Sequence, residues 1–379
     1  MLRRLLIPLV LLTALIAVVR FLSMDPDPAP LEPLSLADAL QTDLEGYDRA
    51  YGPRPIVFPA DHGPHPDFKL EWWYVTGNLD DDEGNPFGYQ VTIFRNALAP
   101  PGDGREPDLP WATRQLYIAH VAVTDGGEGT YVSEERVVRA AGGAAGARKN
   151  AMDVWVGPVS IRGYGDGLDS LHVDAPVGES TLSLTLKAQK PIVFQGDQGF
   201  SAKSDAPGNA SYYYSVTRFS AAGTLVRDGR SIELSGTSWL DREWSTSLLD
   251  RTQTGWDWFS LQLDDGSELM YFRLREEDPS VVPYRDGVLI RPDGQRIELD
   301  VDDMTLTSSG TWTSPASGAT YPTNWRLQVP AHAIDVAIDP LIPDQEFRAA
   351  LHYWEGAVRV SGSHTGRGYA ELTGYERTP

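Results

Sequence analysis

Short runs in which apolar and polar residues alternate, bounded by Gly, Asp, Asn and Pro, constrain the fold of this chain most strongly. In one such run Leu182, Leu184 and Leu186 alternate with polar residues, so all three leucines lie on one face of a β-strand. Residues 89–94 and 115–123 carry the β-branched and aromatic side chains typical of further strands. No sustained apolar pattern of helical period follows the first fifty residues. The sequence therefore predicts an all-β protein.

Many short antiparallel strands are usually closed into barrels, because closure removes exposed strand edges. With 379 residues, the chain is long enough for two antiparallel β-barrel domains that each have their own core. Small barrels can hold an apolar ligand at the mouth or between domains. The predicted fold is therefore compatible with a binding function.

Two similar hairpins support the division into two domains. The segments 73–95 and 258–273 share an aromatic pair, a Leu-Asp-Asp turn, a tyrosine on the second strand and a closing arginine. This likeness indicates an internal duplication, and a chance similarity between two aromatic hairpins is the alternative. A duplication places the domain boundary within 236–249, and we predict domains at 51–240 and 241–379.

Charge and cysteine content exclude several classes of function. The chain has 53 acidic and 32 basic side chains and a formal net charge of -21, so its surface would repel the phosphates of nucleic acid. It has no cysteine, which excludes disulfides, thiolate metal sites and a cysteine nucleophile. The seven histidines lack the short spacing of metal ligands, and neither a metal nor a cofactor is predicted.

The first residues have the pattern of an export signal. Arg3 and Arg4 precede an uncharged apolar run over 5–19, as in a secretory signal. The run is short for a membrane span and no clear cleavage site follows, so a signal peptide and an uncleaved signal anchor both stay open for 1–24. The proline-rich residues 25–50 are expected to form a linker. We expect a periplasmic or cell-envelope protein, which the anchor would hold in the inner membrane.

Three motifs distinguish this chain from a generic β protein. They are HPDFKLEWWYVTG at 65–77, GTSWLDREW at 236–244 and GYAELTGY at 368–375. Together they resemble the AttH/CrtC lipocalin-like family, and the similarity runs from Tyr51 to Tyr375. The resemblance implies two consecutive lipocalin-like domains, in agreement with the duplication.

Members of that family differ in activity. Carotenoid hydratases add water across a terminal alkene of an acyclic carotenoid, fungal relatives promote cycloaddition, and many bacterial members are known only as predicted secreted hydrolases. The resemblance implies a hydrophobic, polyene-like or lipid-like ligand and an envelope ABC transporter as a partner. This chain departs from the hydratase pattern, because it has no histidine between His172 and His332. It also lacks a Gly-x-Ser-x-Gly nucleophile elbow, which argues against a serine hydrolase.

The second motif contains two of the three predicted catalytic residues. Strand alternation puts Trp239, Asp241 and Glu243 on one face and the intervening residues on the other. Hydration of an alkene requires an acid that protonates carbon and aromatic faces that shelter the cation, so a carboxyl group of raised pKa beside tryptophan would serve. We predict Asp241, Glu243 and Tyr214 as catalytic. The alternative is that the two carboxylates satisfy arginines or backbone donors at a domain seam.

The first motif contributes aromatic residues that could belong to a ligand site or to a core. Alternation puts Glu71 and Trp73 on one strand face and Trp72 and Tyr74 on the other. One of the two aromatic faces must therefore fill a barrel. A ligand contact by Glu71 or Tyr74 is the alternative to a purely structural role.

Further polar residues complete the predicted ligand site. His120 lies in the middle of a predicted strand, where a hydrogen-bonded core role is the alternative. Arg218 is expected to share a strand face with Tyr214, and a buried arginine there would seek Asp241 or Glu243. The predicted ligand-binding residues are Glu71, Trp73, Tyr74, Arg95, His120, Arg218, Trp239, Trp244 and Trp258.

Three classes of function remain. We expect an exported carrier or accessory protein that binds a hydrophobic lipid or isoprenoid ligand, with an enzyme of the hydratase, cyclase or hydrolase type as the alternative. An enzyme requires a cavity lined by Asp241, Glu243 or Tyr214 and at least one carboxyl of raised pKa, whereas a carrier requires an apolar cavity without convergent ionisable groups. A scaffold for a transporter complex would have filled barrels and no cavity.

Overall fold

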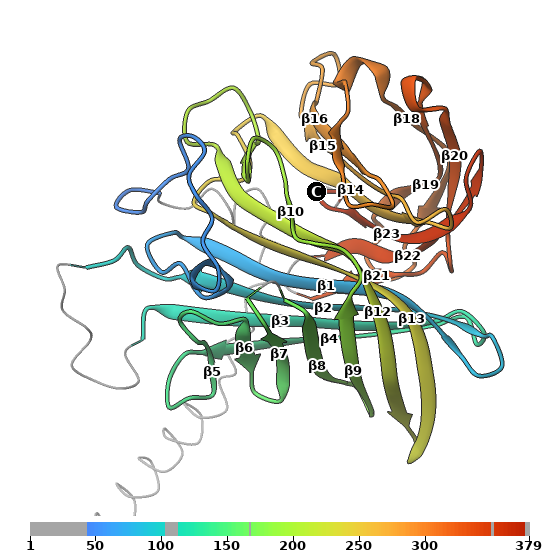
Figure 1. Cartoon of the computed structure of the whole chain (residues 1–379), viewed down its shortest axis with the longest axis horizontal. Helices are drawn as coiled ribbons and strands as arrows, with labels where there is room; N and C mark the ends of the chain where they lie inside the picture. Colours follow the sequence, from blue (N-terminus) through green and yellow to red (C-terminus); the bar gives the residue numbers. More distant parts are fainter. Residues whose placement is uncertain (1–43, 103–112, 167, 350–351, 376–379) are drawn as a thin grey trace, which may run out of the picture. The chain divides into compact units, whose positions relative to one another are not determined.

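The chain folds almost entirely into β-structure. The computed structural model forms a nearly closed antiparallel barrel and a half-barrel sheet, which confirms the predicted all-β, lipocalin-like fold (Figure 1). The predicted signal or anchor at 1–24 lies outside the described residues, as does the linker up to residue 43. Within the described part of the chain, no helix is long and apolar enough to cross a membrane. The structure describes residues 44–102, 113–166, 168–349 and 352–375.

The first sheet has the strand order β4-β3-β2-β1-β13-β12-β9-β8-β7-β6-β5, with β10 and β11 paired to β12. A short 3-10 helix, η1 (Ala60–His62), precedes it. Its strands are β1 (Leu70–Asp81), β2 (Pro86–Ala97), β3 (Gln115–Asp125), β4 (Thr130–Arg139), β5 (Ala145–Ala147), β6 (Asp153–Val156), β7 (Val159–Tyr164), β8 (Ser170–Val177), β9 (Ser180–Ala188), β10 (Val193–Phe194), β11 (Phe200–Ala202), β12 (Ala210–Arg227) and β13 (Arg230–Ser245).

The first sheet encloses its own apolar core, because it curls until β6 and β8 pack against β3 and β4. In β9, Leu182, Leu184 and Leu186 are fully buried in this core, whereas Thr185 and Lys187 are exposed. The face predicted for this strand is therefore confirmed.

Truncation of one of these leucines tests the packing of the first core. Leu184→Ala removes a fully buried side chain and leaves a cavity, so we expect the free energy of unfolding to fall by about 2–5 kcal/mol. Thr185→Ala is the matched control on the same strand, because that side chain faces solvent. Urea unfolding measures both variants, and equal midpoints would contradict the assigned face.

The second sheet has the strand order β17-β16-β15-β14-β23-β22-β20-β19-β18, with β21 paired to β22. It curls around a core that contains Phe259, Trp325 and Trp354. Two further 3-10 helices belong to this half, η2 (Val301–Asp303) and η3 (Pro330–His332). Its strands are β14 (Gln253–Leu263), β15 (Glu268–Glu276), β16 (Tyr284–Ile290), β17 (Arg296–Glu298), β18 (Thr305–Thr313), β19 (Thr320–Val329), β20 (Ile334–Pro340), β21 (Glu346–Arg348), β22 (His352–Gly362) and β23 (Gly366–Leu372).

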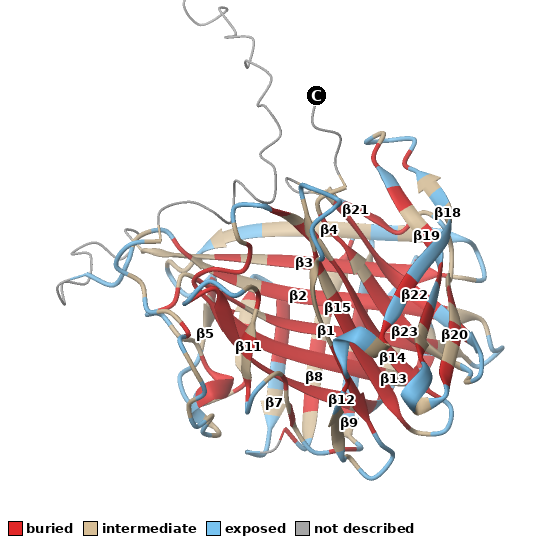
Figure 2. Ribbon diagram, turned by 90° about the horizontal axis from the view of Figure 1, so that it is seen from above, coloured by how far each residue is buried: buried red, intermediate tan, exposed pale blue. Residues whose placement is uncertain are grey.

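The two sheets face each other through a third cluster of side chains. Tyr74 of β1, Trp239 of β13 and Trp258 of β14 are buried in this cluster. The Asn78 amide of β1 also donates a hydrogen bond of 3.0 Å to the Gly368 carbonyl of β23. Figure 2 shows that the central strands of both sheets are mostly buried. The space between the sheets is therefore an interior region, distinct from the two barrel cores.

The chain passes from the first sheet to the second between Ser245 and Gln253. Strand β13 continues without a break across residue 240, where the boundary between domains 51–240 and 241–379 is predicted. The division into these two domains stays a prediction. The part of β13 that follows residue 240 belongs to the first sheet by its pairing with β1 and β12.

The two similar hairpins carry equivalent ion pairs. Glu71 lies opposite Arg95 across β1 and β2, and Asp257 lies opposite Arg273 across β14 and β15. Both pairs form salt bridges. Two positions after each acid, an aromatic side chain faces the core of its own sheet. An alignment of the two hairpins on their ion pairs therefore differs by one residue from the alignment on their aromatic pairs. The duplication itself stays an inference.

Candidate functional site

Carboxyl groups lie on the faces that the two sheets turn toward each other. Asp241 and Glu243 extend from β13 of the first sheet, and Glu355 and Glu371 extend from β22 and β23 of the second. The first three are buried and Glu371 is partly buried. Such groups are rarely buried without cations, so this interface is the candidate functional site.

The alternation predicted for β13 is confirmed. Trp239 and Asp241 lie on the face toward the second sheet, where the Trp239 indole donates to Asp241. Arg242 and Trp244 lie on the opposite face, where the guanidinium group of Arg242 lies 5.2 Å from the centre of the Trp244 ring. A single strand thus serves the site on one side and the first core on the other.

Asp241 accepts hydrogen bonds from three neutral side chains. The Tyr213 hydroxyl donates to Oδ2 at 2.8 Å, the Trp239 indole donates to Oδ1 at 2.7 Å, and the Ser215 hydroxyl also donates to Oδ1. Burial raises the pKa of Asp241 to about 7, because the loss of hydration outweighs the three donors. A carboxyl group with this pKa can hold or release a proton at neutral pH.

Glu355 and Glu371 form a carboxyl pair, because the β22–β23 register places them directly opposite each other. Burial and the neighbouring Glu371 raise the pKa of Glu355 well above its usual range. Burial also raises the pKa of Glu371 to about 8, and the negative charges of Asp241 and Glu243 act in the same direction. Since two close carboxyl groups cannot readily both ionise, the pair holds a proton at neutral pH.

Glu243 is the carboxylate of the site with a cationic partner. Its Oε1 lies 2.9 Å from Nζ of Lys203 and also accepts a hydrogen bond from Ser211. The Lys203 ammonium group lies 4.7 Å from the centre of the Phe272 ring, which adds a cation–π contact. Glu243 therefore forms a buried ion pair at the edge of the carboxyl cluster.

Aromatic rings surround the carboxyl groups. Trp239 and Trp258 meet edge to face with ring centres 6.4 Å apart, and Tyr74 meets Trp258 in the same way at 5.4 Å. Burial raises the pKa of Tyr74 well above its usual range, and the nearby Glu355 and Glu371 add to this effect. The site thus combines proton donors with rings that can stabilise a positive charge.

Tyr214 does not lie beside the β13 carboxylates, in contrast to the prediction. It lies opposite Arg242 in the β12–β13 register and packs in the first core, where its hydroxyl is 2.6 Å from Nδ1 of His62. The neighbouring Tyr213 faces the second sheet and bonds Asp241 instead. The register of β12 against β13 determines which of the two tyrosines faces the site.

Four of the predicted ligand-binding residues belong to the first core. Glu71 forms salt bridges with Arg95 and Arg242, and these two cations hold its pKa well below the usual range although complete burial acts in the opposite direction. The Arg242 guanidinium group lies 4.0 Å from the centre of the Trp73 ring and also faces Trp244. This cluster supports β13 from behind, and a ligand contact by its members stays a prediction.

Arg218 does not reach the β13 carboxylates, so its predicted pairing is wrong. It forms a salt bridge with Glu268 of β15, which also lies 2.6 Å from Nζ of Lys190. A β-bulge between Val216 and Phe219 shifts the register of β12 at this point and re-aims the arginine.

Several site residues were not found from the sequence. The prediction names Tyr214 and not the neighbouring Tyr213, and neither Lys203 nor Glu355 lies in a recognisable motif. Glu371 lies in the third family motif, which was the available signal for it. Five residues of the predicted set meet between the sheets, namely Tyr74, Trp239, Asp241, Glu243 and Trp258. His120 lies outside this group, in a separate chain of hydrogen bonds.

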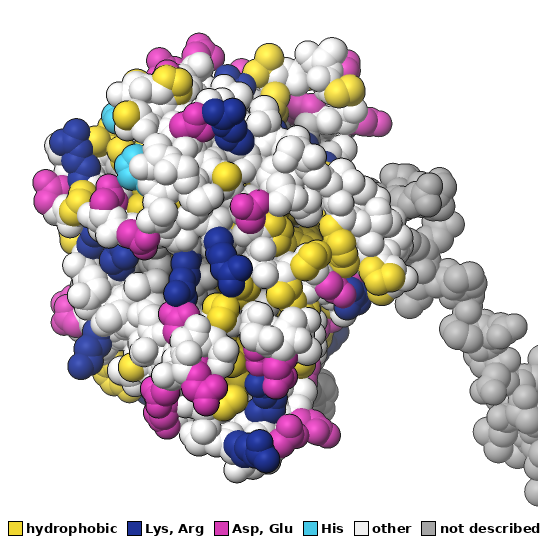
Figure 3. Space-filling model, turned by 90° about the vertical axis from the view of Figure 1, so that its right-hand side faces the viewer, with side chains coloured by type: hydrophobic (Ala, Val, Ile, Leu, Met, Phe, Trp, Pro, Cys, Tyr) yellow, Lys and Arg dark blue, Asp and Glu magenta, His cyan; other side chains and the backbone are white. Residues whose placement is uncertain are grey.

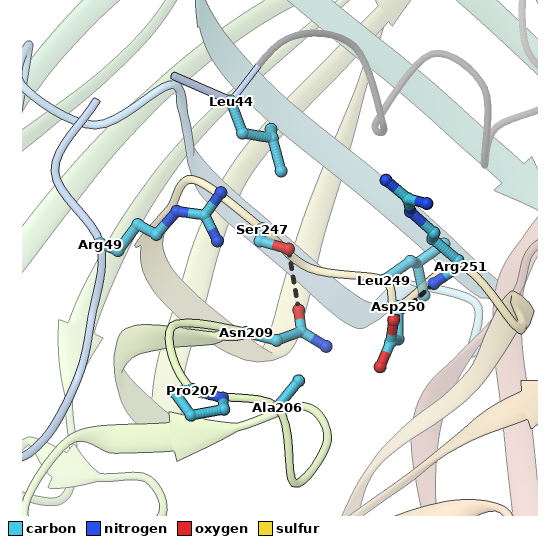
Figure 4. Close-up of a pocket in the computed structure, with 9 residues that line it drawn as sticks. All are labelled: Leu44, Arg49, Ala206, Pro207, Asn209, Ser247, Leu249, Asp250 and Arg251. Atoms are coloured by element: carbon cyan, nitrogen blue, oxygen red, sulfur yellow. Dashed lines mark hydrogen bonds between the residues drawn. The ribbon is translucent and has the colours of Figure 1, made fainter. Parts of the chain in front are cut away.

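A pocket of about 700 Å³ lies where β12 begins and β13 ends (Figure 4). Within its lining, the Ser247 hydroxyl donates to the Asn209 amide oxygen at 3.1 Å. Leu249 also belongs to the cluster between the sheets, so the pocket adjoins the carboxyl site. The pocket combines apolar and charged residues, namely Leu44, Arg49, Ala206, Pro207, Asn209, Ser247, Leu249, Asp250 and Arg251.

Figure 3 shows acidic and basic side chains interspersed over one face of the molecule. Among the described residues, no three His, Asp or Glu side chains are placed to hold a metal ion.

An antiparallel protein with a nearly closed barrel and a half-barrel sheet falls in the class of lipocalin-like proteins. The chain belongs to the AttH-like family, because the model of that family matches residues 49–375. The resemblance inferred from the three motifs is thereby confirmed.

Solved structures agree with this assignment. An AttH protein of Nitrosomonas europaea is 36% identical over 87% of this chain and 100% of its own length, with a TM-score of 0.78. Kievitone hydratase of Nectria haematococca is 16% identical over 86% of this chain and 98% of its own length, with a TM-score of 0.66. CghA, solved with Sch210972, has a TM-score of 0.53 at 16% identity over 86% and 95%. The last two show a shared fold only, and no curated protein matches this chain.

The raised pKa values predict that stability falls as pH rises. Asp241 and Glu371 have pKa values of about 7 and about 8 when folded, above their ordinary values of 3.8 and 4.5. The folded state therefore binds protons more tightly, so its advantage is complete below pH 4 and is lost as pH rises toward 8. Urea midpoints from pH 5 to 9 should decline less steeply for the Asp241→Asn/Glu371→Gln variant. Parallel profiles would contradict the assigned protonation.

Proposed function

We propose that this protein is an acid–base enzyme that protonates an unsaturated, apolar substrate between its two sheets. The observation that carries the proposal is the meeting of Asp241 with the Glu355–Glu371 pair among aromatic rings. Carboxyl groups of raised pKa are one of the two features expected of an enzyme, and the pocket at the strand ends does not supply the other, because neither Asp241 nor Glu243 lies in its lining.

The chemistry follows from the distribution of charge. A protonated carboxyl group, Asp241 or Glu371, donates its proton to an alkene carbon and becomes a carboxylate, and the adjacent carbon becomes a cation. The faces of Trp239 and Trp258 stabilise that cation. Water then adds to the cation, and the proton that this water loses returns to a carboxylate of the site. Protons and charge balance, and the product is an alcohol. This route assigns the acid role to carboxyl groups and therefore needs no histidine in the β13 motif.

The 700 Å³ pocket is the proposed entrance for the substrate. Asn209 and Ser247 in its lining flank the strand ends that carry Ser211 and Glu243. Its mixed lining suits a substrate with an apolar body and one polar end.

Kievitone hydratase shares the fold, which is compatible with a water-adding reaction here. The same similarity is compatible with an accessory protein that carries a lipid without changing it. We retain this carrier function as the second candidate, because the pocket adjoins the aromatic cluster between the sheets.

Turnover of a defined polyene distinguishes the two candidates. The purified protein is incubated in ¹⁸O-labelled water with lycopene, an acyclic polyene, in detergent micelles, and the extract is analysed by mass spectrometry. β-Carotene is the matched control, because its ends are closed rings of similar apolar character. Addition of one labelled water molecule to lycopene alone supports the enzyme, and saturable quenching of tryptophan fluorescence without a mass change supports the carrier. Neither binding nor turnover with lycopene would contradict both.

Export to the cell envelope is a further part of the proposal. It rests on Arg3, Arg4 and the apolar run over 5–19, which have the order of a signal or anchor. Membrane association of the full-length chain, lost when residues 1–24 are deleted, would support the anchor, and recovery of the intact chain in the cytoplasm would contradict export. An envelope ABC transporter is the proposed partner, and co-purification from membranes tests it.

A further inference from the structure

A chain of hydrogen bonds connects the surface of the first sheet to the second sheet. His120 of β3 lies opposite Glu135 of β4, and Nε2 of the imidazole is 3.0 Å from a carboxylate oxygen of Glu135. On the other side of the ring, Nδ1 is 2.7 Å from the hydroxyl of Tyr353 on β22. The Glu135 side chain is 22% exposed, whereas that of His120 is 7% exposed. The chain thus leads from solvent to the interior.

The imidazole of His120 packs against two aromatic rings. Its ring stacks on Phe347 with centres 4.3 Å apart, and Phe94 meets it edge to face at 5.2 Å. These two contacts are uncharged, so Glu135 from β4 and Tyr353 from β22 are the titratable groups that face the ring. Burial lowers the pKa of His120 and Glu135 partly offsets this effect, which favours a neutral imidazole. A neutral ring can accept a proton at one nitrogen and release one from the other.

The inner end of the chain reaches the carboxyl pair. The Gln90 amide donates to the Tyr353 hydroxyl at 3.0 Å and also interacts with Glu355. Tyr353 and Glu355 are two residues apart on β22 and therefore face the same side. The gap between the tyrosine hydroxyl and the carboxyl group is thus bridged by a polar side chain.

Polar atoms without a well-formed partner gather around this inner end. In native interiors nearly all buried polar atoms are hydrogen-bonded, so a local group of exceptions marks a place with a role other than packing. Five buried atoms in this region make no hydrogen bond of standard geometry within the described residues, namely Tyr74 Oη, Gln90 Oε1, Tyr131 Oη, Glu355 Oε1 and Tyr369 Oη. Tyr74 and Gln90 nonetheless interact with Glu355, and Tyr369 interacts with Thr124.

We propose that Glu135, His120 and Tyr353 form a proton relay through which the buried carboxyl groups exchange protons with solvent. A proton taken up by Glu135 passes to Nε2 of His120, and the proton on Nδ1 moves to the Tyr353 oxygen. Tyr353 releases its own hydroxyl proton to the carboxylate of Glu355 on the same face of β22, while the Gln90 amide, which donates to the Tyr353 oxygen, holds that oxygen in place. Each group gains one proton and loses one, and His120 ends with its proton on Nε2 instead of Nδ1, so a flip of the imidazole ring resets the relay before the next passage. The relay rests on the proposed function only in that it serves the same carboxyl groups.

A pH jump tests the relay without any substrate. The full-length protein is mixed from pH 9 to pH 6, and stopped-flow infrared spectroscopy follows the band of protonated carboxyl groups. Tyr353→Phe removes one hydroxyl and Glu135→Gln removes the outer acid, and each is expected to slow protonation by roughly tenfold or more with the final amplitude unchanged. Tyr89→Phe is the matched control, because it also removes a buried hydroxyl, which is 2.6 Å from Ser238 outside the relay.

Each outcome decides between the proposals. A slower rate in Tyr353→Phe and Glu135→Gln, with a normal rate in Tyr89→Phe, supports the relay. Normal rates in both relay variants at full amplitude would overturn the relay and leave the proposed function standing. Equal slowing in Tyr89→Phe would show general loosening of the fold and would also overturn it. Absence of the band in the wild-type protein would show that no buried carboxyl group is protonated, and this result would contradict both the relay and the proposed function.

Discussion

Asp241→Asn is expected to lower the turnover of an acyclic polyene by about 10²- to 10⁴-fold, the usual contribution of a positioned proton donor. The substitution retains size, its amide oxygen can still accept from Ser215 and Trp239, and the Tyr213 hydroxyl can turn to accept from the amide nitrogen. It removes only the ability to deliver a proton. Mass spectrometry of the lycopene reaction in labelled water measures the effect on rate, and fluorescence quenching measures binding.

The control for Asp241→Asn is Asp257→Asn. Asp257 is buried in the second half of the chain and forms a salt bridge with Arg273. Its side chain lies on the face of β14 that is turned toward the second core, away from the carboxyl site. A carboxylate that acts only in the fold should affect stability and leave turnover per folded molecule unchanged. Equal turnover in Asp241→Asn and the wild-type protein would refute the acid role.

Glu71→Gln should produce the largest loss of stability. Glu71 is fully buried between Arg95 and Arg242, and a neutral amide would leave two buried guanidinium groups without an anion. Breaking a buried ion pair from one side costs about 3–5 kcal/mol. Chemical unfolding monitored by tryptophan fluorescence is the measurement. The expected fall in midpoint is accompanied by loss of the fixed geometry of β13, since Arg242 lies on that strand.

An exposed pair provides the control for Glu71→Gln. Asp335→Asn also removes a carboxylate from an arginine, but the side chains of Asp335 and Arg326 are 44% and 58% exposed. Solvent already screens that pair, so its midpoint should stay within experimental error. Similar midpoints for the two variants would contradict the structural role of Glu71.

Strand faces could be predicted from the sequence because side chains alternate with a period of two. The burial of Leu184 between exposed neighbours, and the separation of Asp241 from Arg242, follow from this periodicity alone. The family motifs added the lipocalin-like fold. These predictions need only local order along the chain.

Contacts between strands could not be predicted, since they depend on register and on irregularities of the sheet. The pairing of Asp241 with Tyr213 rather than Tyr214 is set by the β12–β13 register. The β-bulge after Val216 turned Arg218 toward Glu268. Periodicity in one strand contains neither piece of information.

The approach of the second sheet was also beyond sequence reasoning. Glu355 joins the site through the pairing of β22 with β23 and the packing of that pair on β1 and β2. No local pattern around Glu355 indicates this position. The residue pattern of a buried strand face is the same whether that face packs on a barrel core or on another sheet.

The protonation state of the carboxyl site is the central claim, and an infrared titration tests it most directly. The band of protonated carboxyl groups is recorded from pH 5 to 10 for the wild-type protein and for Asp241→Asn and Glu371→Gln. We expect a band that persists at pH 7 in the wild-type protein, titrates between about 7 and about 8, and loses a component in each variant. Complete ionisation of the wild-type protein by pH 6 would contradict the account.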